Sequence, residues 1–187
     1  AVGAKAAETE WQIPEDTSTI ESLTPEQARK LVATTDVKLS LSINGLTTLD
    51  TETAKALAEL QGDSLYLEGL TTLSPATAKA LASLKPSLSL NGLTTLTPEA
   101  ATALAKYGGP CLLLDGITTL SDETAKALAD YECKILSICG LTTLSEVAAT
   151  ALAKYQGEWL LLNGLATLAP NVAKAIAEFS GRTLSIG

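Results

Sequence analysis

The sequence lacks histidine and methionine altogether, and only 4% of its residues are aromatic. Without histidine, the chain cannot carry His-based acid–base catalysis or Ser-His nucleophilic pairs, and it lacks the commonest metal ligand. It contains no apolar run near the roughly 18 residues that a membrane-spanning helix needs. Acidic residues outnumber basic ones by 21 to 13, and the resulting net charge of −8 argues against nucleic acid or an anionic membrane as the main partner.

The polar residues that remain give no sign of a catalytic or metal site. Asp and Glu lie mainly in expected helix starts and loops, where they suit a solvated surface and the helix dipole. Three cysteines, Cys111, Cys133 and Cys139, lack a fourth ligand for zinc. We therefore expect a protein that is not an enzyme and has no catalytic residues, metal or cofactor.

A repeat of about 24 residues fills most of the chain. The stretch NGLTTLDTETAKALAEL (44–60) returns as EGLTTLSPATAKALASL, NGLTTLTPEAATALAKY and DGITTLSDETAKALADY. Its turn glycines follow one another at 23 or 24 residues: Gly45, Gly69, Gly92, Gly116, Gly140 and Gly164. Such a period indicates a solenoid in which each coil is one supersecondary unit.

Each unit contains a strand followed by a helix. The motif LxLxG, as in 65–69, alternates with period two and predicts a short strand with its leucines inward. Ser74 suits a helix N-cap and Pro75 the first helical position. Equivalent caps are Thr24, Asp50, Thr97, Ser121 and Ser145. Helices of this length are marginal alone, so we expect them to pack on the sheet.

Two helix columns predict how the coils stack. Apolar residues recur at Leu57, Leu81, Leu104, Leu128, Leu152 and Ile176, and small ones at Ala54, Ala78, Ala101, Ala125, Ala149 and Ala173. Strands stack more closely than helices, so the solenoid should curve with its strands on the concave side. A third column, Leu60, Leu84, Tyr107, Tyr131, Tyr155 and Phe179, predicts a stack of rings that serves packing.

The LxLxGLxxL pattern and the Ala-rich helix resemble the leucine-rich-repeat family, most closely its Ala-rich bacterial variants of planctomycete type. The resemblance covers roughly residues 20–187 and implies an α/β fold. It implies a curved right-handed solenoid with a parallel sheet on the concave face and short helices on the convex face. It says almost nothing about function.

One departure from the family concerns the Asn ladder that usually follows each strand. This chain has Thr pairs there, as in Thr47-Thr48 and Thr71-Thr72. We hypothesise that one Thr column replaces the ladder and bonds the turn backbone of the next coil. Simple turn propensity is the alternative explanation.

The two ends of the chain differ. Residues 1–19 are expected to be a leader and capping segment, in which Trp11 and Ile13 supply a short strand or an apolar lid. Residues 20–187 are expected to form about seven coils, beginning with a helix within 20–34. The last strand, 183–187, would have an open edge. Either the natural protein continues there, or another chain covers the edge, which makes self-association possible.

The compartment stays open. Residues 1–10 lack an apolar targeting core, and the absence of Met fits a mature secreted or periplasmic bacterial protein or an artificial start. Stacking would place the Cα atoms of Cys111 and Cys133 about 8 Å apart, just beyond disulfide range. We expect free thiols, although a bent loop would allow that bond.

The residues between the inward leucines form three outward columns, which is where the coils differ most. One contains Ser42, Tyr66, Ser89, Leu113, Ser137, Leu161 and Ser185. The column before it contains Ser40, Ser64, Ser87, Cys111, Ile135, Trp159 and Thr183. The column after it contains Asn44, Glu68, Asn91, Asp115, Cys139, Asn163 and Gly187. The usual residue in the first two is Ser, yet coils four to six carry apolar ones.

Apolar residues clustered on an otherwise polar surface mark contact sites. We therefore expect a non-catalytic module that binds a protein partner through its concave strands. The expected contact residues are Tyr66, Leu113, Asp115, Ile135, Trp159, Leu161 and Asn163. Alternatively, Trp159 folds over its neighbours, or missing downstream sequence covers them. Other roles are a structural or envelope spacer, a fragment of a longer repeat protein joined at its C-terminal edge, or a module of an enzyme whose catalytic part lies elsewhere.

Overall fold

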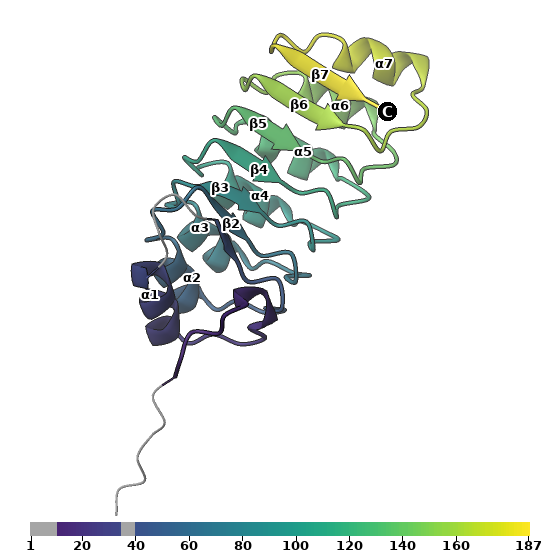
Figure 1. Ribbon diagram of the computed structural model, residues 1–187. Coiled ribbons are helices and arrows are strands. Elements are labelled where there is room, and N and C mark those ends of the chain that lie inside the picture. Colours follow the sequence, from purple (N-terminus) through teal and green to yellow (C-terminus); the bar gives the residue numbers. More distant parts are fainter. Residues whose placement is uncertain (1–10, 35–39) are drawn as a thin grey trace, which may run out of the picture.

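The computed structural model describes residues 11–34 and 40–187, which form one open sheet of seven parallel strands joined by short helices (Figure 1). The strands follow one another in chain order: β1 (Leu41–Ser42), β2 (Ser64–Tyr66), β3 (Ser87–Ser89), β4 (Cys111–Leu113), β5 (Ile135–Ser137), β6 (Trp159–Leu162) and β7 (Thr183–Ile186). The helices are α1 (Pro25–Thr34), α2 (Thr51–Leu57), α3 (Pro75–Leu81), α4 (Pro98–Leu104), α5 (Asp122–Ala129), α6 (Glu146–Leu152) and α7 (Pro170–Ile176). A 3-10 turn, η1 (Thr17–Thr19), precedes them.

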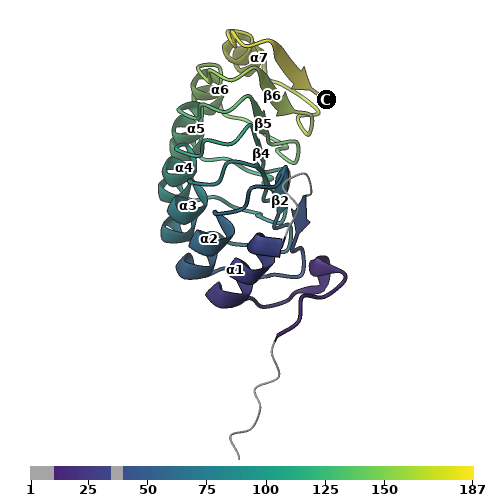
Figure 2. The ribbon, with the colours of Figure 1, turned by 60° about the vertical axis from the view of Figure 1, so that its left-hand side comes forward.

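The strands and helices form two curved layers. Figure 2 shows the helices α1 to α7 along the outer side of an arc and the strands along its inner side. The expected α/β solenoid, with a concave sheet and convex helices, is confirmed. The curvature follows from the difference between the two spacings, since hydrogen-bonded strands lie about 4.8 Å apart and packed helices lie farther apart.

The core lies between the layers and is built mainly from Leu and Ala. The inward leucines of the strands are buried, for example Leu65, Leu112 and Leu136. The expected helix columns are also buried from α2 to α6, although Ala173 in α7 is half-buried. Alternate strand residues therefore point outward onto the concave face, as the period of two predicts.

Side-chain caps begin most of the helices. The hydroxyls of Ser74 and Ser121 accept hydrogen bonds from backbone N–H groups three residues on, as predicted. Asp50 accepts from the N–H groups of Glu52 and Thr53. The hydroxyl and N–H of Thr53 both lower the pKa of the Asp50 carboxyl, so the cap is ionised at neutral pH. Helix α7 begins at Ala169 without a side-chain cap.

The predicted ladder of turn threonines is largely wrong. The Thr-Thr pairs are exposed, and among them only Thr142 bonds a neighbouring coil, the preceding one, through its Oγ1 to the carbonyl of Thr118 at 3.2 Å. A different Thr column does this, inside the helices: the Oγ1 atoms of Thr53, Thr77 and Thr124 donate to the carbonyls of Leu23, Leu49 and Leu96 at 3.1 to 3.2 Å. These hydroxyls are buried, so each bond satisfies a carbonyl of the preceding coil away from water.

A second ladder runs along the concave rim, at the position that follows each strand. The side-chain oxygens of Asn44, Asn91 and Asp115 accept the backbone N–H groups of Glu68, Asp115 and Cys139 at 3.2, 2.9 and 2.8 Å. Each bond joins one coil to the next. This ladder of Asn and Asp side chains lies three positions before the first threonine of each turn pair.

The predicted ring stack is confirmed. Tyr107, Tyr131, Tyr155 and Phe179 are stacked, with ring centroids 5.8, 6.3 and 6.2 Å apart. The Tyr155 hydroxyl donates to the carbonyl of Cys133 at 2.8 Å, and that of Tyr107 donates to the carbonyl of Pro86. The buried Tyr131 hydroxyl has no hydrogen-bond partner among the described residues.

The two ends of the solenoid are covered differently. At the first end, the segment around η1 lies against β1, and the N–H of Gly45 donates to the carbonyl of Ser18 at 2.7 Å. Trp11 and Ile13 are partly buried against the core. Residues 1–10 of the expected leader lie outside the described residues. At the other end, Leu184 and Ile186 of β7 are only half-buried.

Candidate functional site

The candidate site lies on the concave face of β4, β5 and β6. Parallel pairing in register aligns Cys111 with Ile135 and Ile135 with Trp159. The same register aligns Leu113 with Ser137 and Ser137 with Leu161. Neighbouring strands are about 4.8 Å apart, so these rows are continuous across three strands. We call the set the concave apolar patch: Cys111, Leu113, Ile135, Trp159 and Leu161.

Trp159 is the most exposed member of the patch, with 38% of its surface accessible. The other four members are half-buried. Part of the Trp159 ring therefore stays in contact with water. A large ring that stays in water on a sheet face is the usual anchor of a protein contact.

The thiol of Cys111 behaves as part of the apolar surface. Burial raises its pKa to about 11, with smaller contributions from Cys133 and Asp115, so it stays protonated at neutral pH. All three cysteines are free, so the expected free thiols are confirmed and no Cys111–Cys133 bond forms. The thiolate needed for nucleophilic or metal chemistry is therefore disfavoured at Cys111.

Asp115 has a structural role that sequence reasoning missed. Its Oδ1 accepts from the Ser137 hydroxyl at 2.5 Å and from the Cys139 N–H at 2.8 Å. Ser137 is buried between the patch residues Leu113 and Leu161 of the adjacent strands. Asp115 thus holds the floor of the patch in place, and only its second carboxylate oxygen is left for a partner.

Asn163 and Tyr66 lie at the margins of the patch. The Asn163 Oδ1 accepts from the Ser185 hydroxyl at 2.6 Å, which again joins neighbouring coils. Tyr66 is half-buried on β2, two strands from Leu113, with Ser89 between them. The strands therefore bring the five patch residues together, whereas Tyr66 stands apart from them.

The concave columns carry charge of one sign. Glu68 and Asp115 are their only ionisable acidic side chains, and no Lys or Arg occupies the three columns. One Glu68 oxygen accepts from the Ser89 hydroxyl at 3.1 Å and from the Asn91 amide at 3.4 Å. A partner that covers the patch would therefore contact the carboxylates of Glu68 and Asp115 along one edge of the concave face.

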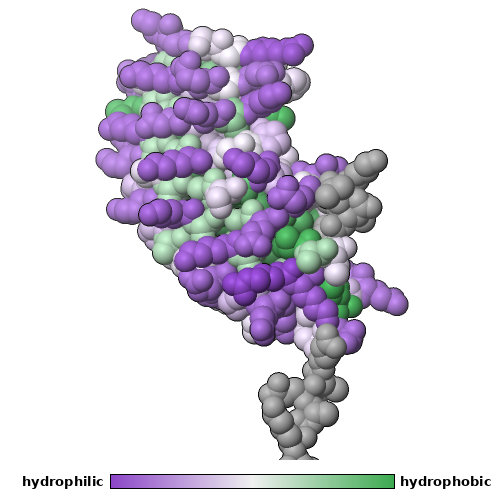
Figure 3. Space-filling model, turned by 90° about the vertical axis from the view of Figure 1, so that its left-hand side faces the viewer, coloured by the Kyte–Doolittle hydropathy of each residue, from purple (hydrophilic) through white to green (hydrophobic). Residues whose placement is uncertain are grey.

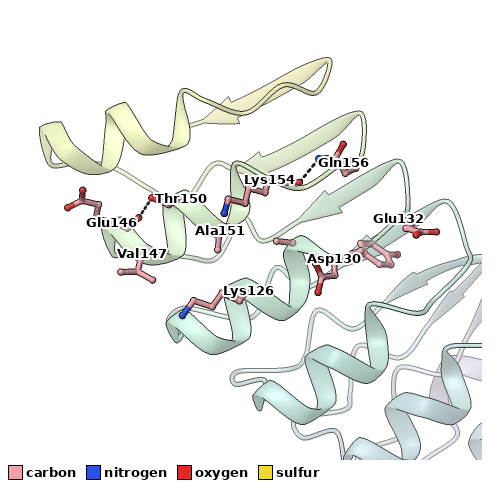
Figure 4. Close-up of a pocket in the computed structure, with 11 residues that line it drawn as sticks. Lys126, Asp130, Glu132, Glu146, Val147, Thr150, Ala151, Lys154 and Gln156 are labelled. Carbon is pink, nitrogen blue, oxygen red and sulfur yellow. Dashed lines mark hydrogen bonds between the residues drawn. The ribbon is translucent and has the colours of Figure 1, made fainter.

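A second surface feature was missed by sequence reasoning: a groove of about 870 Å³ between α5 and α6 on the convex face. Figure 3 shows the helix side, where rows of hydrophilic side chains alternate with paler strips. Figure 4 shows Lys126 of α5 and Val147 of α6 on opposite sides of the groove. Val147 is 46% exposed and replaces the Glu, Ala or Asn of the other coils, so the signal was present in the sequence.

Other kinds of site find no support in the part of the chain that the structure describes. No group of three or more His, Cys, Asp or Glu side chains is arranged to hold a metal ion among those residues. No helix within 11–34 or 40–187 is long and apolar enough to cross a membrane. The chain matches no protein-family model and no curated protein sequence.

Proposed function

We propose that this chain is a non-catalytic protein-interaction module of the leucine-rich-repeat type, which binds a protein partner through its concave strand face. The observation that carries the proposal is the concave apolar patch, with Trp159 at its most exposed point. The first three coils have Ser at these positions except for Tyr66, so the fold does not require apolar residues there. Binding of a partner at this surface would explain why apolar residues occur there.

The surroundings of the patch indicate the chemistry of the partner. The patch offers apolar contact, whereas Glu68 and Asp115 offer carboxylates on the rim at the C-terminal ends of the strands. Complementary partners would combine apolar or aromatic side chains with a Lys or Arg beside them. Contacts with the rim charges would mainly raise the association rate, and the apolar contacts would supply most of the affinity.

The test is selection of peptides from a displayed random library on the purified protein. We expect enriched peptides that combine apolar and basic residues, and that bind Trp159→Ser or Leu161→Ser at least tenfold more weakly, which is about 1.4 kcal/mol. The matched control is Val147→Ser, which removes an exposed apolar side chain (46% exposed, against 38% for Trp159) from the convex face. It should bind the peptides as the unchanged protein does.

Two results would contradict the proposal. One is a selection that yields no specific peptide, and the other is equal binding to the Trp159→Ser and unchanged proteins. Thermal unfolding of each variant separates loss of binding from loss of fold. Trp159 is 38% exposed and lies on the surface of the sheet, so its removal should lower the unfolding temperature without unfolding the protein under the assay conditions.

The second candidate role is a structural spacer, or a piece of a longer repeat protein, joined at the C-terminal edge. One observation favours it: the inward residues Leu184 and Ile186 of β7 remain half-exposed, unlike their equivalents in the inner strands. A spacer would continue the same stacking and would not use the concave patch.

A further inference from the structure

Three Asn-Gly pairs occupy the same position of the repeat, in the turn that follows a strand: Asn44-Gly45, Asn91-Gly92 and Asn163-Gly164. The last two lie in the identical tetrapeptide Leu-Asn-Gly-Leu, at 90–93 and 162–165. Asn is chemically labile before glycine, because a glycine nitrogen has no neighbouring side chain to hinder its attack on the Asn amide. The local sequence gives these two pairs the same intrinsic reactivity, so only the tertiary structure can make them differ.

The stacking of the coils requires the glycine of each pair. A Cβ added at Gly92 would lie 2.0 Å from the carbonyl oxygen of Glu68, and a Cβ added at Gly164 would lie 2.3 Å from that of Cys139. A larger residue would therefore displace the backbone of the preceding coil. The fold retains a labile pair wherever Asn precedes this glycine.

The fold restrains the first two pairs. The Oδ1 of Asn91 accepts the backbone N–H of Asp115 at 2.9 Å, and its Nδ2 donates to the Glu68 carboxylate at 3.4 Å. In the first pair, the Gly45 N–H itself donates to the Ser18 carbonyl at 2.7 Å. The attack needs a free glycine nitrogen and an amide group that can turn toward it. Each of these pairs therefore lacks one of the two requirements.

The third pair meets both requirements. Asn163 is exposed, whereas the other two Asn side chains are half-buried. Its Oδ1 accepts from the Ser185 hydroxyl at 2.6 Å, a side-chain donor that can rotate with it, and its Nδ2 has no partner among the described residues. The Gly164 N–H has no acceptor in that part of the chain either. The next coil has Gly187 at the equivalent position, so no side chain there covers Asn163.

We propose that Asn163 is a modification site, at which the folded chain deamidates spontaneously. The Gly164 nitrogen attacks Cγ of Asn163, and the bond from Cγ to Nδ2 breaks as the new bond forms. The proton of the Gly164 N–H passes through solvent to Nδ2, which leaves as ammonia. One water molecule then opens the resulting succinimide, at Cγ to give Asp or at the backbone carbonyl carbon to give isoaspartate. The reaction needs only water, so this inference does not rest on the proposed function.

The two products change the concave face in different ways. Asp adds one negative charge two residues after Leu161, in the column that already contains Glu68 and Asp115. Isoaspartate places the side-chain methylene in the backbone between Leu162 and Leu165, which are both buried. An extra backbone atom between two core residues disturbs their packing. The first product therefore makes the edge of the concave face more acidic, and the second loosens the coil that contains β6.

The experiment incubates the 187-residue protein in heavy-oxygen water at mildly alkaline pH and follows each Asn by peptide mapping with mass spectrometry. We expect Asn163 to gain one labelled oxygen at least about tenfold faster than Asn91, a difference of about 1.4 kcal/mol in activation free energy. In urea that unfolds the protein, the two identical tetrapeptides should react at the same rate. The comparison isolates the effect of the tertiary structure from that of the local sequence.

The matched control is Asn163→Gln, which keeps an amide at the site but would have to close a larger ring. It should be folded by circular dichroism and show no labelled product at this position. The proposal is overturned if Asn163 stays intact in the folded protein while it reacts in urea, or if Asn91 keeps pace with it in the folded protein. No partner takes part, so the result is distinguishable from failure of the peptide-binding test at Trp159.

Discussion

At the scale of single residues, the unpaired hydroxyl of Tyr131 coincides with one deviation from the repeat, a Cys in place of a Gly at position 133. Glycine lies two positions after the ring in three coils, at Gly109, Gly157 and Gly181. A Cβ added at Gly157 would lie 2.1 Å from the Tyr155 hydroxyl oxygen. In the remaining ring coil this position is Cys133, whose side chain competes for the space that glycine leaves to the hydroxyl. The Tyr131 hydroxyl has no hydrogen bond to the Gly109 carbonyl, which corresponds to the acceptors of Tyr107 and Tyr155.

Two Tyr→Phe changes test this explanation. Tyr155→Phe removes the bond to the Cys133 carbonyl and leaves that buried oxygen unpaired, which should cost about 1–3 kcal/mol of unfolding free energy. Tyr131→Phe removes a hydroxyl that has no partner and should be neutral or stabilising. Urea denaturation of both variants gives the comparison. Equal losses would show that the Tyr131 hydroxyl is bonded after all.

At the scale of elements, each helix depends on its cap and on the preceding coil. The helices have mostly seven residues, too few to be stable alone. In α3, Ser74 caps the first turn and the buried Thr77 bonds back to the Leu49 carbonyl. The same column is apolar in three coils, at Ala100, Ala148 and Val172. The Thr ladder is therefore interrupted, and the rim ladder of Asn44, Asn91 and Asp115 joins coils independently of it.

A matched pair of Thr→Val changes separates the two Thr positions. Thr77→Val should cost about 1–2 kcal/mol, because it leaves the Leu49 carbonyl without its donor in the interior. Thr72→Val changes an exposed turn residue and should stay within about 0.5 kcal/mol. Both values come from urea denaturation at neutral pH. A larger loss at Thr72 would restore the turn-ladder hypothesis.

At the scale of the whole molecule, stability is the sum of contacts between neighbouring coils. An inner coil is buried on two sides, whereas the last coil is buried only against β6. The concave apolar patch lies on β4, β5 and β6, where Asp115 accepts hydrogen bonds from the Ser137 hydroxyl and the Cys139 N–H beneath it.

Two Leu→Ala changes at equivalent positions measure this asymmetry. Leu136 in β5 is fully buried, so Leu136→Ala should cost about 2–5 kcal/mol. Leu184 in β7 is half-buried, so Leu184→Ala should cost about half as much or less when the protein is dilute. Denaturant titrations at low protein concentration supply both numbers. Equal costs would mean that the last coil is covered in solution.

The sequence by itself determined the architecture. Its period, the alternating leucines and caps such as Ser74 gave strands, helices and their order, because these signals are local and each is repeated several times. The stacked rings and the curvature also followed from aligned columns. The patch residues Ile135, Trp159 and Leu161 could be recognised as deviations from Ser in the same columns.

Only the tertiary structure decided which polar groups meet. The turn threonines and Thr77 are equally plausible donors in the sequence, and burial alone separates them. The sequence suggested that Asp115 is free to contact a partner. In the stacked coils, however, its carboxylate accepts hydrogen bonds from the Ser137 hydroxyl and the Cys139 N–H. The groove beside Val147 likewise requires the packing of α5 on α6. A hydrogen bond between coils joins residues more than twenty positions apart in the sequence. If the donor moves by one position within the repeat, its hydrogen-bond partner changes, although the pattern of apolar and polar residues stays the same.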